Sequence, residues 1–233
     1  MLHSSKGNPL FITLTINKCL WLYKSGSRFT TGAFSCNLLD INWVDKFLDE
    51  LKKIDVKYKS LEITLDNSLC RFGILPCQQE WPDRKVLEYL AISHFQQKYP
   101  NFLSKNYQFL FDKVRFNQPT FTVAVPDYIH EGLIVLSTSQ AIRNFSPALF
   151  KIINILNLKD FWYEEDQFFY HVNCAIKEKE TIDVFPKKFI NHDSIDLWNP
   201  QSVAKIIFAR KERGYKHWSS LMMNSPEQFF NLI

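Results

Sequence analysis

The order of strand-like and helix-like patterns at the start of the chain constrains its fold more than any other feature. Residues 10–36 contain three runs rich in apolar and β-branched residues, separated by polar turn residues, which predicts a three-strand meander. Residues 41–54 then place apolar side chains at helical spacing, and SLEITL at 60–65 returns to a strand pattern. A strand that follows a helix normally runs parallel to an earlier strand. This order predicts an α/β fold with a mixed sheet.

The same order of patterns returns in the second half of the chain. Residues 160–186 hold three further strand-like runs, and 199–212 have a helical pattern. The segments between the two meanders are predicted as a helix at 81–99, a strand pair within 107–126, a helix at 127–140 and a connecting helix at 144–156. The repetition predicts two lobes, a first one at 1–145 and a second, shorter one at 146–233.

Composition excludes several classes of protein. With 233 residues, 46% of them hydrophobic and 15% aromatic, the chain can bury a core without metal or disulfide support. The net charge of +4 is too small to indicate a nucleic-acid partner by itself. The five cysteines are odd in number and never occur as C-x-x-C, which favours a reducing compartment. The N-terminus does not resemble a signal peptide. We therefore expect a cytoplasmic chain.

An arginine stands inside a strand-like run in the stretch SLEITLDNSLCRFGILP at 60–76. The polar residues Asp66, Asn67 and Ser68 separate two such runs and predict a turn. Arg71 could bond carbonyl groups or a carboxylate and so hold the turn at Asp66 against the adjoining segment. Alternatively, Arg71 faces solvent on an alternating strand. Under either alternative, Arg71 has no catalytic role. We therefore predict a structural role for Arg71 and Asp66.

Several stretches together resemble one branch of a known fold. These are LEITLDNSLCRFGILP, then Trp81, a helix ending in FQQKYP, TFTVAVPDYIHEGL and RNFSPALFKIIN. In this order they resemble the cytoplasmic actin-like domains of type II secretion protein L and type IV pilus assembly protein M, over roughly residues 10–185. The resemblance implies a two-lobed actin-like (ribonuclease H-like) fold with a truncated second lobe. It also implies a role in recruiting an assembly ATPase and an inner-membrane partner.

The residues that an actin-like ATPase needs for phosphate binding are missing from the expected positions. Such enzymes use two hairpin turns, usually with an aspartate and small residues. Here the first turn is Ile16-Asn17-Lys18, and the second, 164–167, carries three carboxylates that would repel a triphosphate. The six glycines form no G-x-G loop, and His130-Glu131 lacks the second histidine of a zinc-protease motif. We therefore predict no catalytic residue, no cofactor and no metal site.

The end of the chain offers two further features. The basic stretch KIIFARKERGYKHW at 205–218 could contact nucleic acid, although a helix would place its charges on an ordinary solvated face. The apolar segment HWSSLMMNSPEQFFNLI either folds back onto the second lobe or docks a partner protein, with Phe229 and Phe230 as anchors.

The function predicted from these features is a non-catalytic assembly or docking component of a type II secretion or type IV pilus-type machine. We expect it to bind protein partners at the cytoplasmic face of the inner membrane and to reach the membrane only through a partner. Two alternatives stay open: an atypical nucleotide-binding actin-like protein and a nucleic-acid-binding protein.

Overall fold

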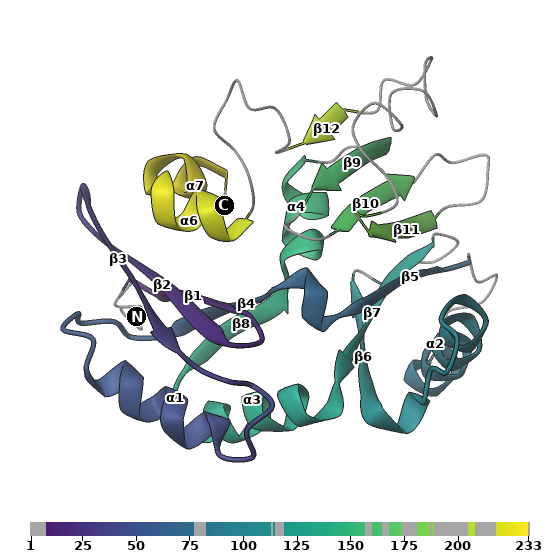
Figure 1. Ribbon diagram of the computed structural model, residues 1–233, viewed down its shortest axis with the longest axis horizontal. Coiled ribbons are helices and arrows are strands. Elements are labelled where there is room, and N and C mark those ends of the chain that lie inside the picture. The colour runs from purple at the N-terminus through teal and green to yellow at the C-terminus, as the bar shows by residue number, and fades with distance from the viewer. Residues whose placement is uncertain are drawn as a thin grey trace, which may run out of the picture.

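The computed structural model describes residues 8–76, 83–112, 114, 119–156, 160–164, 168–173, 181–186, 188, 205–207 and 218–232. These residues form three β-sheets and the helices that surround them (Figure 1). The α-helices are α1 (Trp43–Lys52), α2 (Arg84–Lys98), α3 (Asp127–Ser139), α4 (Ala148–Leu156), α6 (Trp218–Asn224) and α7 (Pro226–Leu232). Short 3₁₀ turns are η1 (Asn67–Leu69) and η2 (Ser104–Asn106).

The first sheet has five strands in the order β3-β2-β1-β4-β8. They are β1 (Leu10–Leu14), β2 (Lys18–Ser25), β3 (Arg28–Ser35), β4 (Leu61–Leu65) and β8 (Ile142–Pro147). β1 is central and buried along its whole length, as its continuous apolar sequence requires. It pairs antiparallel with β2 and parallel with β4. The predicted meander and the parallel return of the strand after α1 are therefore confirmed.

β8 is a strand where the sequence pattern predicts the beginning of a connecting helix. Ile142–Pro147 pairs in parallel with β4, and α4 begins directly after Pro147. The strand lies at the edge of the sheet, so two consecutive residues, Arg143 and Asn144, are both exposed. Because this exposure breaks the alternation of buried and exposed positions, the sequence carries no clear strand signal there.

The second sheet is small and antiparallel, in the order β5-β7-β6. Its strands are β5 (Arg71–Leu75), β6 (Tyr107–Asp112) and β7 (Thr120–Pro126). Helix α2 packs against it around a separate apolar cluster that includes Leu87, Phe95 and Phe109. The Tyr99 hydroxyl donates to Phe72 O at 2.9 Å and accepts from Phe72 N–H at 3.2 Å. Burial raises the pKa of Tyr99 to about 12.

The third sheet repeats the start of the first one. Its strands β9 (Asp160–Glu164), β10 (Phe168–Asn173), β11 (Thr181–Pro186) and β12 (Lys205–Ile207) follow the order β11-β10-β9-β12. β9, β10 and β11 are antiparallel, and β12 is parallel to β9, as β4 is to β1. The predicted second meander is confirmed. The predicted division into lobes at residues 145 and 146 stays a prediction.

The helix predicted at 199–212 is wrong at Lys205–Ile207, which form β12. Ile206 and Ile207 fit a strand at least as well as a helix, since β-branched residues pack well on a pleated sheet. A run of only three residues has no periodicity that separates the two states. The pairing with β9 selects the strand conformation, because the parallel neighbouring strand supplies hydrogen-bond partners for the backbone groups of Lys205–Ile207.

Helices cover both faces of the first sheet. Figure 1 shows α1 and α3 on one face and the C-terminal helices α6 and α7 on the other. Phe229 of α7 is 1% exposed, and its ring packs edge-on against Phe11 of β1, with the ring centroids 5.9 Å apart. The C-terminal segment therefore folds back onto the protein, which is one of the two alternatives from the sequence. It packs on β1 and β2 of the first sheet, whereas the sequence analysis expected it on the second lobe. Among the described residues, no helix is long and apolar enough to span a membrane.

Candidate functional site

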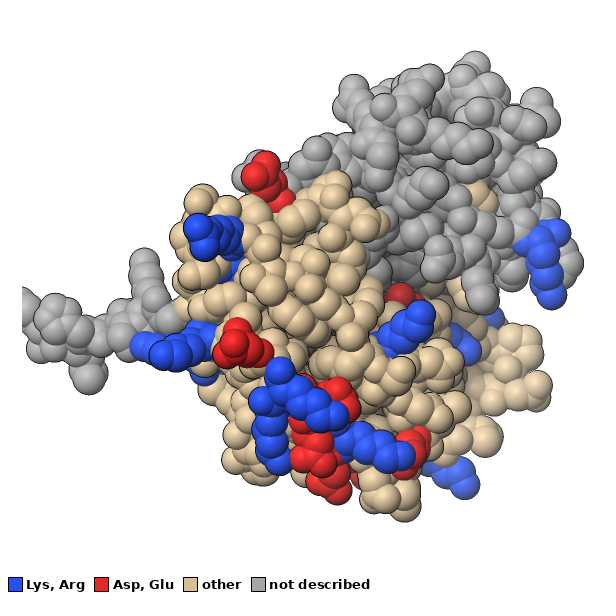
Figure 2. Space-filling view, turned by 60° about the vertical axis from the view of Figure 1, so that its left-hand side comes forward, with Lys and Arg blue, Asp and Glu red and all other residues tan. Residues whose placement is uncertain are grey.

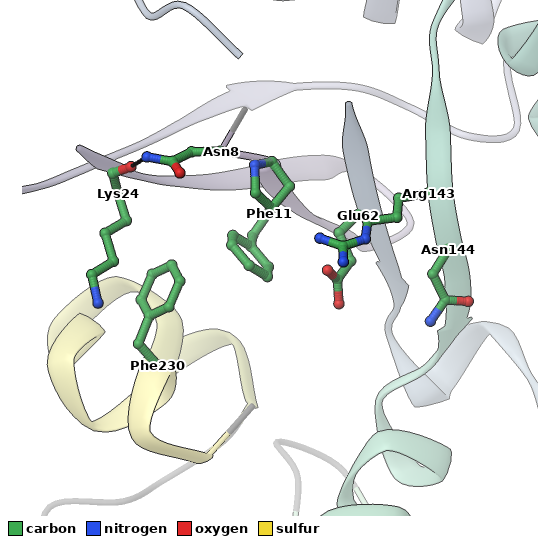
Figure 3. A pocket seen from close by; sticks show the side chains of 8 residues that line it. Asn8, Phe11, Lys24, Glu62, Arg143, Asn144 and Phe230 are labelled. Atoms are coloured by element: carbon green, nitrogen blue, oxygen red, sulfur yellow. Dashed lines mark hydrogen bonds between the residues drawn. The ribbon is translucent and has the colours of Figure 1, made fainter. Parts of the chain in front are cut away.

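A cleft of about 600 Å³ lies between the first sheet and helix α7 (Figure 3). Strands β1, β2, β4 and β8 line it near the edge of the sheet where β1, β4 and β8 begin, and Phe230 of α7 closes one side. The cleft exists because α6 and α7 pack over β1 and β2 and leave the neighbouring part of the same face open. It therefore combines residues from both ends of the chain.

Among the described residues that line the cleft, positive charge exceeds negative charge. Lys24 and Arg143 line it together with one carboxylate, Glu62. The Glu62 carboxylate also forms an ion pair with Lys151 of α4, with Nζ 3.0 Å from Oε1. Burial lowers the pKa of Lys151, and the nearby Glu62 carboxylate opposes this shift. Among the described residues, neither Lys24 nor Arg143 forms an ion pair, so the cleft offers two cations to an anionic ligand.

Aromatic side chains form the apolar part of the cleft. The rings of Phe11 and Phe230 meet edge to face, with centroids 4.9 Å apart. The Lys24 Nζ lies 4.7 Å from the centroid of the Phe230 ring and 5.3 Å from that of Phe29. Such cation–π contacts hold the Lys24 ammonium against α7 without neutralising its charge. Asn8 donates from Nδ2 to the Lys24 carbonyl at 2.7 Å and orders the rim (Figure 3).

The described side chains of the cleft are suited to binding a ligand. The described residues that line the cleft have amide, aromatic, lysine, arginine and glutamate side chains, with one proline. Two cations beside two phenylalanine rings can hold a group that combines a carboxylate with an apolar surface. Acidic peptide segments with large apolar residues have this chemistry.

The predicted structural residues lie apart from the cleft. Asp66 accepts from Ser68 N–H at 2.9 Å and begins η1, so it orders the predicted turn. Arg71 is exposed, and its guanidinium donates to the Cys70 carbonyl at 3.0 Å. Among the described residues, it forms no hydrogen bond or ion pair with Asp66. A structural role for Arg71 stays a prediction. A bond between Arg71 and the Asp66 carboxylate would have supported this role, and the described residues do not show one.

Asn67 has the structural function that the sequence analysis sought in Arg71. Its side chain is 1% exposed and its Oδ1 accepts from Leu149 N–H at 2.8 Å, at the beginning of α4. The first N–H groups of a helix lack partners within the helix, so this bond caps α4 from a distant segment. No sequence signal identifies it, because the two residues are 82 positions apart.

Replacing Asn67 by alanine is expected to lower the free energy of unfolding by about 1–3 kcal/mol, because the buried Leu149 N–H loses its partner. Urea unfolding followed by circular dichroism measures the change. Ser68→Ala is the matched control, since the Ser68 side chain is exposed and, within the described part of the chain, bonds only Asp66 of the same turn. Equal stability of the Asn67→Ala variant and the parent chain would contradict the capping role.

The predicted partner-binding residues differ in their accessibility. Phe229 is buried between Phe11 and Trp218, with ring centroids 5.9 and 4.9 Å away. Phe230 is half-buried and lines the cleft. In this arrangement only Phe230 can meet a partner without movement of α7. Partner binding through Phe229 and Phe230 stays a prediction.

The structure describes some of the remaining candidates from the sequence analysis and not others. The first hairpin turn is closed by Thr15, whose Oγ1 accepts from Lys18 N–H at 3.1 Å and whose N–H donates to Lys18 O. The His130 ring packs against Phe145, with centroids 6.2 Å apart. Residues 165–167 of the acidic turn at 164–167 and residues 208–217 of the basic stretch lie outside the described residues. Within the described part of the chain, no group of three or more metal-ligating side chains occurs.

Lys24, Glu62 and Arg143 are functional candidates that the sequence analysis did not identify. Each is a single charged residue in or beside a strand, which the pattern indicates as an ordinary solvent-facing position. Their convergence depends on the order of strands in the sheet, so only the fold brings them together.

Comparisons with known proteins agree with this fold. No family model matches the chain, and no curated protein matches it. One similar solved structure is the cytoplasmic domain of EpsL, an inner membrane component of the type II secretion system of Vibrio cholerae. It has 9% sequence identity and a TM-score of 0.47, and the match covers 78% of this chain and 73% of that chain.

A second similar structure is a Bacteroides thetaiotaomicron protein with an actin-like ATPase fold and unknown function. Its sequence identity is 11% and its TM-score 0.51, and the match covers 99% of this chain and 89% of that chain. This likeness over almost the whole chain shows that the protein has the actin-like ATPase fold. The fold class predicted from the sequence is confirmed.

Proposed function

We propose that this chain is a non-catalytic actin-like docking component of a type II secretion or type IV pilus-type machine, a pseudo-ATPase that acts at the cytoplasmic face of the inner membrane. The sequence resemblance supports the kind of machine, and the cleft supports the mode of action. In this proposal a partner protein inserts an acidic segment with apolar side chains between the first sheet and α7. The chain itself stays in the cytoplasm and reaches the membrane only through such partners.

One observation supports the proposal most: Lys24 and Arg143 lie in the same cleft as the rings of Phe11 and Phe230. Among the described residues, neither Lys24 nor Arg143 forms an ion pair, and the Glu62 carboxylate is bonded to Lys151. A partner carboxylate would therefore gain two charge-assisted contacts at the rim of the cleft. Phe230 and Phe11 would bury the adjacent apolar side chain, and large buried aromatic residues dominate the energetics of many interfaces.

Affinity capture from the native host, followed by cross-linking and peptide mapping, tests this function. We expect the captured partner to be a component of the secretion or pilus apparatus, cross-linked near α7 and β8. Arg143→Glu should abolish the capture, because it reverses the charge of the cleft rim. Lys105→Glu, which reverses an exposed charge on η2, is the matched control and should leave it intact. Capture that is unaffected by Arg143→Glu would contradict docking in the cleft.

Magnesium ATP is expected to have no effect on the thermal unfolding of the protein. The first hairpin turn lacks glycine, and its residues Thr15 and Lys18 bond each other, so it offers few free backbone donors to a phosphate. Differential scanning fluorimetry with millimolar ATP and magnesium measures the shift. A rise in the melting temperature of several degrees would instead favour an atypical nucleotide-binding protein.

Nucleic-acid binding receives no support from the face of the molecule shown in Figure 2. On the face shown in Figure 2, lysine and arginine side chains are interspersed with aspartate and glutamate, without a broad area of positive charge among the coloured residues. Nucleic-acid-binding surfaces instead gather basic residues on one face. A salt-dependent shift of labelled single-stranded DNA on adding the protein would reverse this conclusion.

A further inference from the structure

A second hollow lies on the opposite side of the first sheet from the cleft. It is a groove of about 490 Å³ between the segment 38–45, which leads into α1, and the first half of α3. We call it the α1–α3 groove. The cleft lies on the side of α6 and α7, whereas α1 and α3 cover the other face of the sheet (Figure 1). A ligand of one hollow therefore does not compete with a ligand of the other.

Large apolar side chains of the α1–α3 groove are exposed to solvent. Ile41 is 94% exposed, Leu39 62% and Val135 55%, and all three line the groove. Single exposed apolar residues are ordinary on protein surfaces, but several around one hollow indicate an interaction site. The floor is Trp43, which is 3% exposed. The groove thus offers an apolar rim above an apolar floor.

Local hydrogen bonds keep the rim in this exposed position. Leu39 N–H donates to Asn37 Oδ1 at 3.0 Å, and Asn42 N–H donates to Asp40 Oδ1 at 3.0 Å. These side-chain bonds fix two successive turns, so Leu38 is directed into the core while Leu39 and Ile41 are directed outward. The groove is preformed, and a ligand would not have to order the segment on binding.

The charge of the groove is the opposite of that of the cleft. Asp40, Asp45 and Glu131 line it, and the described residues that line it include no lysine or arginine. Asp40 is paired with Lys46, whose hydrogen bond lowers the pKa of the Asp40 carboxyl. Within the described part of the chain, Asp45 and Glu131 form no ion pair. Two carboxylates beside an apolar surface would favour a partner that brings cations together with apolar side chains.

We propose that the α1–α3 groove docks a basic amphipathic segment of a second protein partner. An apolar side chain of that segment would lie over Trp43 and Gly132, and flanking lysine or arginine residues would meet Asp45 and Glu131. This site goes beyond the docking function proposed for the cleft, since it takes a ligand of opposite charge on the other face of the sheet. With both sites occupied, the chain would bridge two partners.

Selection from a library of ~12-residue peptides displayed on phage tests the groove. The purified full chain is the bait, and the Leu39→Ser/Ile41→Ser variant is used for counter-selection. We expect the peptides that survive counter-selection to combine lysine or arginine with large apolar residues. An enriched set without basic residues, or no enrichment at all, would overturn the proposal.

Binding of one selected peptide to purified variants then locates the site. Fluorescence anisotropy should show affinity weakened by about tenfold or more for Leu39→Ser/Ile41→Ser and for Glu131→Lys. Tyr89→Ser is the matched control, because Tyr89 is 73% exposed on α2 and outside the groove. Arg143→Glu changes only the cleft and should also leave the affinity unchanged. Affinity that is insensitive to the groove variants, or that falls with Arg143→Glu, would overturn docking in the groove.

Discussion

Replacing Phe229 by alanine is expected to lower the free energy of unfolding by about 3–5 kcal/mol, the cost of removing a large aromatic side chain from a core. Phe229 is 1% exposed, and its ring contacts Phe11 of β1 and Trp218 of α6. Its removal would leave a cavity between the C-terminal helices and the first sheet. Urea unfolding followed by tryptophan fluorescence measures the loss.

Phe230 provides the matched control for this prediction. It has the same ring and the neighbouring position, but it is half-buried and faces the cleft. Phe230→Ala should therefore cost less, about 1–2 kcal/mol, because less apolar area leaves water when Phe230 packs. A Phe229→Ala variant no less stable than Phe230→Ala would show that α7 is not part of the core.

Deletion of residues 225–233 separates a role in the core from a role in docking. If the segment is core, the truncated chain should aggregate or lose its cooperative melting transition, because the face of β1 that Phe229 covers becomes exposed. A soluble truncation that melts cooperatively and loses only its partner would instead assign the segment to docking.

Replacing Gly132 by alanine is expected to lower the free energy of unfolding by about 2–3 kcal/mol, although alanine normally stabilises a helix relative to glycine by about 1 kcal/mol. A Cβ atom at Gly132 would lie 2.1 Å from Cζ2 of the Trp43 ring, far below any contact distance. Trp43 is 3% exposed and held between α1 and α3, so it has little room to move. Thermal and urea unfolding measure the effect.

Two further variants make the Gly132 prediction specific. Ser137→Ala places the same new residue at an exposed position of α3 and should leave the stability within about 0.5 kcal/mol of the parent. Trp43→Leu removes the obstructing ring, so Gly132→Ala should cost much less in that background. An unchanged cost in both backgrounds would show that contact with Trp43 is not the cause.

Much of the fold could be predicted from short stretches of sequence. The two meanders, α1, α2 and α3 and the parallel return of β4 follow from apolar spacing, because a strand or helix that packs on one side repeats that side in its sequence. The strands β8 and β12 could not be predicted in this way. β8 is an edge strand with two consecutive exposed residues and β12 has only three residues, so neither shows an alternation of buried and exposed positions in its sequence.

The candidate sites were predictable to a smaller extent. The sequence directed attention to the end of the chain, and Phe230 does line the cleft. It assigned the polar turn at 66–68 correctly, since Asp66 begins η1. It considered only Arg71 as a residue that could tie the turn to another segment, because a long cation in a strand is conspicuous in a sequence and an asparagine in a turn is not.

The sequence by itself determined which segments become strands and helices wherever burial is periodic along the segment. Only the tertiary structure decided which residues meet: Glu62 with Lys151, Asn67 with Leu149, and Phe11 with Phe229. Periodicity records how one element is buried, and it contains no information about the partner across a long separation. The cleft and the α1–α3 groove arise from such partners, because each is a gap left where elements distant in sequence pack over one sheet.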